Sequence, residues 1–239
     1  MTKFLALAAL LSAAALPAAQ AQTSPTTQLR PVAHFRGIRV GGGIRLTLAA
    51  GHEQRVEVSA ATPDFAANIR TKLEDGILII SYDDLLERDD RKLLKTDHQL
   101  RATITADFLT SLAATSEATV QASGNFAAPD CVLDVTSGAK LTATGLAPEV
   151  LVVRENGGAV VTLAGTAPRL DVRVNGGSTY EGQQLQSVRG QVEANGNSTA
   201  RIAASQELLI EANSGSKVNY YGSPVVSRDL NGGSISSAK

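Results

Sequence analysis

The sequence predicts an all-β protein, a right-handed parallel β-helix-like solenoid with coils of about 18–21 residues. Two patterns favour this fold: a turn that recurs at regular spacing, and short alternating polar and apolar runs between the turns. Composition agrees, because the 239 residues include 21 glycines, no tryptophan and only 4% aromatic residues. Such a chain has to build its core from thin layers of Val, Leu, Ile and Ala.

The recurring turn opens with Asn or Thr and continues with Gly and a small residue. Its openings from Thr136 to Asn231 are 20, 19, 20, 18 and 18 residues apart, and a weaker copy starts at Thr115. Asn and Gly both tolerate positive φ, and stacked Asn side chains can hydrogen-bond along a column. We therefore expect a structural turn ladder made of Asn156, Asn175, Asn195, Asn213 and Asn231 with Gly138, Gly158, Gly177, Gly215 and Gly233.

The runs between turns alternate with period two, which is typical of half-buried strands. In one run Leu170, Val172 and Val174 point one way. The same pattern in an earlier coil, at Cys131, Leu133 and Val135, makes Cys131 a buried thiol. An antiparallel sandwich is the alternative, since Asn-Gly and Gly-Gly are also hairpin signals, but the long spacing favours the solenoid.

Two charged residues disturb the alternation. Glu155 and Arg228 both fall at positions predicted to point inward. Either the register shifts there or the residues lie at an open rim, and the sequence does not choose between these explanations.

The amino terminus predicts export. Met1-Thr2-Lys3, an apolar run from Phe4 to Leu16, and Ala19-Gln20-Ala21 have the layout of a secretory signal peptide, residues 1–21. An uncleaved anchor is the alternative. No later segment predicts an integral membrane helix. The expected location is the periplasm, the cell surface or the extracellular space, and residues 22–34 are expected to form a flexible leader.

Residues 35–239 are predicted to form a single β-solenoid domain. Its amino-terminal part, 35–114, is rich in strands, and regular coils cover 115–239. The segment 83–99 is charged and is expected to be an exposed loop. Asp83, Asp84, Asp89 and Asp90 suggest calcium, but their spacing matches no calcium loop and neighbouring cations compensate them, so a solvated loop is favoured.

Several of these segments carry a family resemblance. They are Phe35–Leu48, Leu73–Ile79, the turns from Ser137 onward, and Tyr221-Gly222-Ser223-Pro224. Together they resemble the head GIN domain family, described as heads of autotransporter adhesins. The resemblance covers about Phe35 to Ile235. It implies an exported bacterial protein with a β-helical fold, and it implies no catalytic residues.

The sequence predicts no enzyme, metal or cofactor. His34, His52 and His98 have no ligand spacing. Sugar lyases and hydrolases on β-helices need clustered or paired carboxylates on an outward face. The outward positions after the turns instead hold Lys140, Thr142, Thr162, Glu181, Thr199, Arg201 and Lys217, with one carboxylate among them.

These seven residues are the predicted binding face. The function predicted for the chain is that of an exported, non-catalytic binding or adhesion-type head with a polysaccharide or protein ligand. The alternative is a structural or assembly module of the cell envelope, in which end strands recruit further copies of the chain. A polysaccharide lyase or hydrolase ranks third. Nucleic acid is not an expected partner, because the formal net charge is −1.

Overall fold

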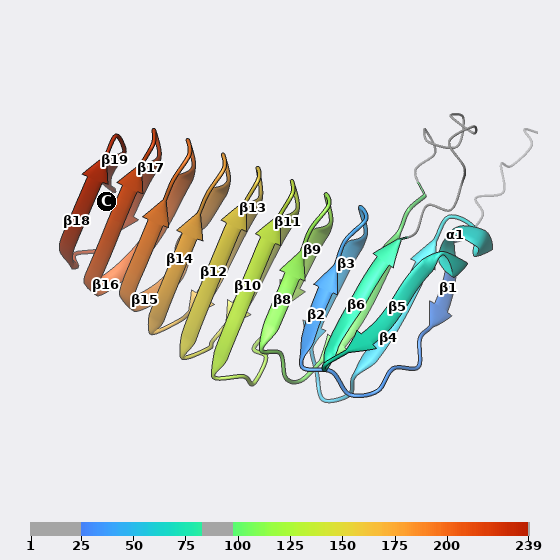
Figure 1. Ribbon diagram of the computed structural model, residues 1–239. Coiled ribbons are helices and arrows are strands. Elements are labelled where there is room, and N and C mark those ends of the chain that lie inside the picture. The colour runs from blue at the N-terminus through green and yellow to red at the C-terminus, as the bar shows by residue number, and fades with distance from the viewer. Residues whose placement is uncertain (1–24, 83–97, 239) are drawn as a thin grey trace, which may run out of the picture.

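The computed structural model describes residues 25–82 and 98–238 and confirms the β-solenoid. The predicted signal peptide and the Asp83–Asp90 cluster lie outside these residues. Each coil adds one strand to each of two sheets, and the coils stack along one axis (Figure 1). Pairing between these coils is parallel, so the antiparallel sandwich is wrong for this part of the chain.

The first sheet of the regular coils is built from β8, β10, β12 and β14, and the second from β9, β11 and β13. Towards the C-terminus, β15 and β16 run through the corner and contribute to both sheets. The bounds are β8 Ser111–Ala114, β9 Thr119–Ser123, β10 Asp130–Thr136, β11 Lys140–Leu146, β12 Val150–Asn156, β13 Val160–Thr166, β14 Arg169–Val174, β15 Thr179–Ala194 and β16 Thr199–Asn213.

The core is a set of inward columns that run the length of the stack. Cys131 pairs in register with Leu151, and Leu151 pairs with Leu170. The Cys131 thiol is buried as predicted, and burial raises its pKa to about 11. A thiol that stays protonated is a poor nucleophile.

The amino-terminal coils do not stack in chain order. Strands β2 (Gly37–Val40) and β3 (Arg45–Ala50) lie between the β8/β9 coil and a coil formed by β6 (Ile77–Tyr82) and β7 (Arg101–Ala106). After β3 the chain therefore first forms the end of the stack, which includes β6 and β7. It then continues as β8 on the other side of the β2/β3 coil.

That end of the stack is covered by antiparallel strands. Strand β4 (Arg55–Ala60) pairs with β7, β5 (Ile69–Glu74) with β6, and β1 (Thr26–Leu29) with β4. The expected flexible leader 22–34 thus includes a strand, because β1 satisfies the free backbone edge of β4. Helix α1 (Pro63–Ala67), capped by the Thr62 hydroxyl, lies beside them.

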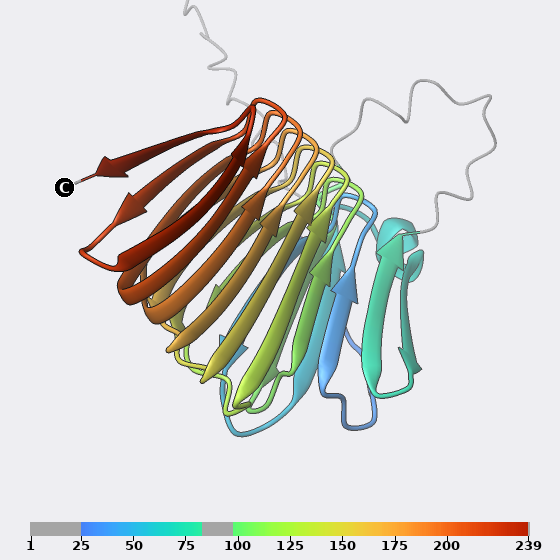
Figure 2. The same ribbon diagram turned by 60° about the vertical axis from the view of Figure 1, so that its left-hand side comes forward.

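Among the residues that the structure describes, no strand covers the opposite end of the stack. Its last coil consists of β18 (Val225–Asn231) and β19 (Ser234–Ala238), which follow β17 (Lys217–Tyr221) (Figure 2). The inward position Leu230 is 42% exposed there. Arg228 pairs in unbroken register with the buried Ile210 and is itself exposed. Of the two explanations offered for Arg228, the open rim holds.

Both explanations are wrong for Glu155. Its strand β12 stays in register with β10 and β14, and Glu155 lies opposite Val135 and Val174. The residue is 1% exposed and far from either end of the stack. A one-residue shift would turn the buried Leu151 and Val153 outward and Arg154 inward, so the strand keeps its register and buries the carboxyl group.

Candidate functional site

The second sheet brings all seven residues of the predicted binding face together on its outward side. They occupy two adjoining columns that run along the stack. Strand pairing aligns Lys140, Thr199 and Lys217 in one column, through Val160 and Thr179. The next column holds Thr142, Thr162, Glu181 and Arg201. We call this surface the second-sheet face.

The one carboxylate of the predicted set is compensated. Arg201 Nη1 donates a hydrogen bond to Glu181 Oε1 and forms an ion pair with it. Retaining and inverting glycosidases need a second carboxyl group within roughly 5–10 Å of the first, on the same face. The two columns of predicted residues supply no second carboxyl group.

Sequence reasoning missed two cations of the same face. Arg45 pairs with Thr119 on one side and with Arg101 on the other, and Thr119 pairs with Lys140. Arg45 and Arg101 therefore extend the Lys140 column. A signal for Arg45 was present, because it is the second residue after Gly43, just as Lys140 is the second residue after Gly138.

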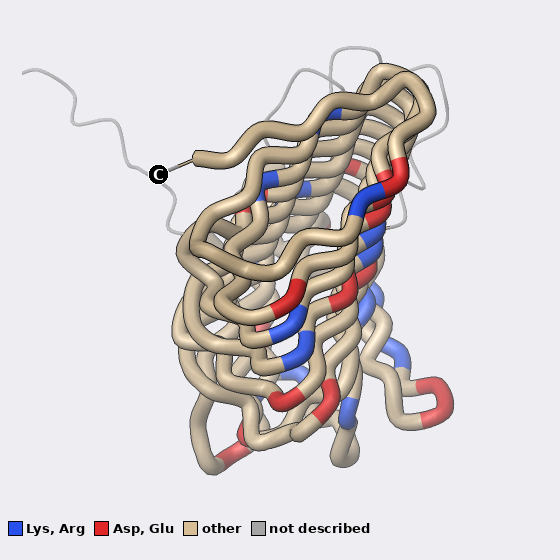
Figure 3. Tube along the Cα trace, turned by 90° about the vertical axis from the view of Figure 1, so that its left-hand side faces the viewer, with Lys and Arg blue, Asp and Glu red and all other residues tan. Residues whose placement is uncertain are grey.

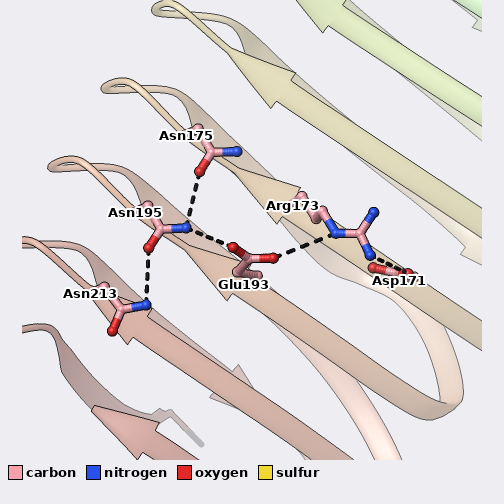
Figure 4. Close-up of polar contacts among 6 residues, drawn as sticks. All are labelled: Asp171, Arg173, Asn175, Glu193, Asn195 and Asn213. Atoms are coloured by element: carbon pink, nitrogen blue, oxygen red, sulfur yellow. Dashed lines mark hydrogen bonds and ion pairs between the residues drawn. The ribbon is translucent and has the colours of Figure 1, made fainter. Parts of the chain in front are cut away.

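The turn ladder is hydrogen-bonded in its middle. Asn195 Nδ2 donates to Asn175 Oδ1 at 3.1 Å, and Asn213 Nδ2 donates to Asn195 Oδ1 at 3.0 Å (Figure 4). Asn156 and Asn231 close the first-sheet strands of their own coils, and Asn231 pairs in register with Asn213. The ladder glycines Gly138, Gly158, Gly177 and Gly215 have φ of 72–76°, whereas Gly233 has no positive φ.

A charged network adjoins the ladder on the outward side of the first sheet. Glu193 accepts a hydrogen bond from Asn195 and lies 3.5 Å from Arg173 Nε, while Arg173 also contacts Asp171 (Figure 4). Along one side of the stack, cations and carboxylates follow one another from coil to coil (Figure 3). Such exposed pairs contribute little stability each, and the compensated charges leave this side without a strong net field.

We expect Asn195→Ala to lower the free energy of unfolding by about 1–2 kcal/mol. The substitution removes the donor to Asn175 and Glu193 and leaves Asn213 Nδ2 without its acceptor. Urea unfolding followed by circular dichroism measures the change. Gln191→Ala is the matched control, since Gln191 lies on the same strand and has no side-chain hydrogen bond among the described residues. Equal losses for the two variants would contradict a stabilising ladder.

Two adjoining hollows lie on the C-terminal coils, and sequence reasoning missed both. The smaller, about 490 Å³, is lined mainly by small and apolar groups that include Val188, Ala203 and Tyr221. The larger, about 880 Å³, carries Arg169 and the Arg189–Glu207 ion pair. Both are lined by Pro168 and Val188. We call the two hollows together the corner groove. It could not be predicted from the sequence, because its walls come from segments that are distant in the chain.

The core also holds two polar groups without partners. Both carboxyl oxygens of Glu155 lack a hydrogen bond among the described residues, and so does the Tyr180 hydroxyl. Burial, with a smaller contribution from the nearby Glu181 carboxylate, raises the pKa of Glu155 to about 9. Burial also raises the pKa of Tyr180, with Glu155 adding to the shift. The Tyr180 ring lies across Gly182, where a Cβ would come 2.3 Å from the hydroxyl oxygen.

Histidine and metal chemistry find no support in the part of the chain that the structure describes. No group of three His, Cys, Asp or Glu residues there could hold a metal ion. His98 stacks on Phe65 with ring centroids 4.1 Å apart, which is a packing role. Among these residues no helix has the length and apolar character needed to cross a membrane.

Several solved structures share the fold. The chain is similar to an adhesin, so described provisionally, from Bacteroides fragilis NCTC 9343, with a TM-score of 0.78, 18% identity, and 90% of this chain and 97% of that one covered. A Parabacteroides distasonis ATCC 8503 protein described as lipid binding gives a TM-score of 0.67 at 13% identity, covering 90% and 97%. A further adhesin-type protein from Parabacteroides merdae ATCC 43184 gives 0.65 at 15% identity, covering 90% and 96%.

These likenesses show the fold alone, since all three identities are below 20%. No curated protein matches the chain in sequence. A family model gives the relationship directly. The model described as "Putative auto-transporter adhesin, head GIN domain" matches residues 34–224, and the chain belongs to this family.

Proposed function

We propose that this protein is an exported, non-catalytic binding head of the adhesin type, and that its second-sheet face contacts an extended polysaccharide or protein ligand. The observation that carries the proposal is the alignment of the predicted polar residues in two adjoining outward columns. A flat strand face with regularly spaced hydroxyl, amide and cationic groups suits a linear ligand. Family membership and the adhesin-type neighbours support the same assignment.

The proposal also predicts which substitutions weaken binding. We expect the purified protein to bind at least one member of an array of bacterial and host glycans and matrix proteins. Thr162→Tyr and Thr199→Tyr, which place rings on a flat contact surface, are expected to weaken that binding about tenfold or more. Val152→Tyr is the matched control, because it adds the same ring to the outward side of the first sheet.

The control separates two locations for the ligand. Equal weakening by all three variants would reject a site on the second-sheet face. Retained binding in the two Thr variants, with loss in Val188→Arg, would place the ligand in the corner groove instead. If the protein bound no member of the array, the binding proposal would be rejected.

The second candidate function is assembly within the cell envelope, and the open coil at the β18/β19 end favours it. A further coil buries Leu208, Ala212 and Val218, but within the described part of the chain no coil covers their counterparts Val226, Leu230 and Ile235. Sedimentation of the purified protein over a range of concentrations tests this function. A monomer at every concentration would reject assembly through this end.

A further inference from the structure

The amino-terminal half of the second-sheet face carries cations and hydroxyl groups but no carboxylate on its outward positions. We call this part the basic hydroxyl patch, and it spans the five neighbouring strands β7, β3, β9, β11 and β13. Its outward residues are Arg101, Thr103, Thr105, Arg45, Thr47, Ala49, Thr119, Gln121, Ser123, Lys140, Thr142, Thr144, Val160 and Thr162.

The carboxylates on the two strands that flank the patch are compensated. On one side Glu57 pairs with Arg55, and on the other Glu181 pairs with Arg201. Arg45, Arg101 and Lys140 have no ion pair with any residue that the structure describes. The patch therefore keeps a net positive charge between two neutral borders, although the whole chain has a formal charge of −1.

Strand spacing sets the distances between these cations. Neighbouring strands lie about 4.8 Å apart. Arg101 and Arg45 are on neighbouring strands, and Lys140 lies two strands beyond Arg45. Along the stack axis, Arg101 and Arg45 are therefore about 4.8 Å apart, and Arg45 and Lys140 about twice that distance. The column of Thr47, Thr142 and Thr162 runs parallel to them and offers hydroxyl groups to sugar hydroxyls.

We propose that the basic hydroxyl patch binds an acidic polysaccharide, carboxylated or sulfated, that lies across the strands along the stack axis. This inference rests on the proposed binding function and specifies its ligand class. Single-stranded nucleic acid is disfavoured, because the patch has no aromatic side chain on which bases could stack. An anionic bilayer is disfavoured, because no large apolar side chain projects from the patch to enter it.

The test compares alginate and heparin with neutral dextran as soluble probes in titration calorimetry. We expect both acidic polymers to bind more weakly as salt increases, and dextran not to bind measurably. Arg45→Gln combined with Arg101→Gln is expected to weaken binding about five- to tenfold. The control combines Arg39→Gln with Arg154→Gln on the outward side of the first sheet, where both side chains are exposed.

Each other outcome overturns a defined part of the proposal. Equal weakening by the two double variants would show that net charge, and not the patch, attracts the polymer. Binding of a neutral glycan or a protein from the array, but of neither acidic polymer, would reject this ligand class and leave the proposed function standing. Tighter binding to single-stranded DNA, or binding confined to anionic vesicles, would replace the polysaccharide with that partner. No binding to any probe would reject both proposals.

Discussion

As the pH rises from 4.5 to about 9, the free energy of unfolding is expected to fall by about 1.4 kcal/mol per pH unit because of Glu155 alone. In the unfolded chain this carboxyl loses its proton near its ordinary pKa of 4.5, whereas the folded protein holds the proton up to about 9. The folded state therefore binds one more proton across this window. The stabilising contribution is fully present below pH 4.5 and is lost as the pH approaches 9.

Urea unfolding at a series of pH values measures this slope. We expect Glu155→Gln to remove it, because the amide does not ionise, while stability at acidic pH stays close to that of the parent protein. Glu211→Gln makes the same chemical change at an outward position of β16 and is expected to keep the slope. Identical pH profiles for the parent protein and Glu155→Gln would show that the buried carboxyl is not the cause.

A third variant separates the effect of ionising Glu155 from the cost of burying its polar atoms without hydrogen-bond partners. Glu155→Leu replaces both unpartnered oxygens with apolar surface in a column that already holds Val135 and Val174. Removing a buried polar group without partners is expected to raise the free energy of unfolding by roughly 1–3 kcal/mol even at acidic pH. A loss of stability would mean that the carboxyl has a partner, such as a buried water molecule.

The regular coils could be predicted because their information is local. Each turn opens with its own Asn or Thr, and each run, such as Leu170 to Val174, shows its own period of two. The amino-terminal topology could not, because β2 gives no local sign that its neighbours are β6 and β8, which come from later segments. Arg45 was missed as a site residue, although it follows Gly43 at the same distance as Lys140 follows Gly138. The sequence does not show that the two belong to one column, because that requires β3 to lie beside β9.

The two charged exceptions show where pattern reasoning stops. Alternation correctly predicted that Glu155 and Arg228 point inward, and the cost of burying a charge then suggested that neither was enclosed. The outcome differs because of position along the stack. Glu155 is covered by coils on both sides, so it is enclosed and its protonated form is favoured, whereas Arg228 belongs to the last coil and meets solvent.

We expect the Arg228→Ile variant to self-associate at roughly micromolar concentrations, and the parent protein to remain monomeric there. Arg228 lies between Val226 and Leu230 among the inward positions of β18, and no strand covers that edge in the part of the chain that the structure describes. An inward-pointing charge at a free edge opposes strand addition, because a second copy would have to bury it without a partner. The substitution makes all three positions apolar and removes that penalty.

Sedimentation velocity at increasing protein concentration measures the association. Arg154→Ile is the matched control, since it exchanges the same residues at an exposed outward position of β12, and it is expected to remain monomeric. A monomeric Arg228→Ile variant would show that this charge does not protect the end of the stack. Association of the parent protein itself would mean that Arg228 is tolerated at an interface between copies, and the assembly function would then gain over the binding head.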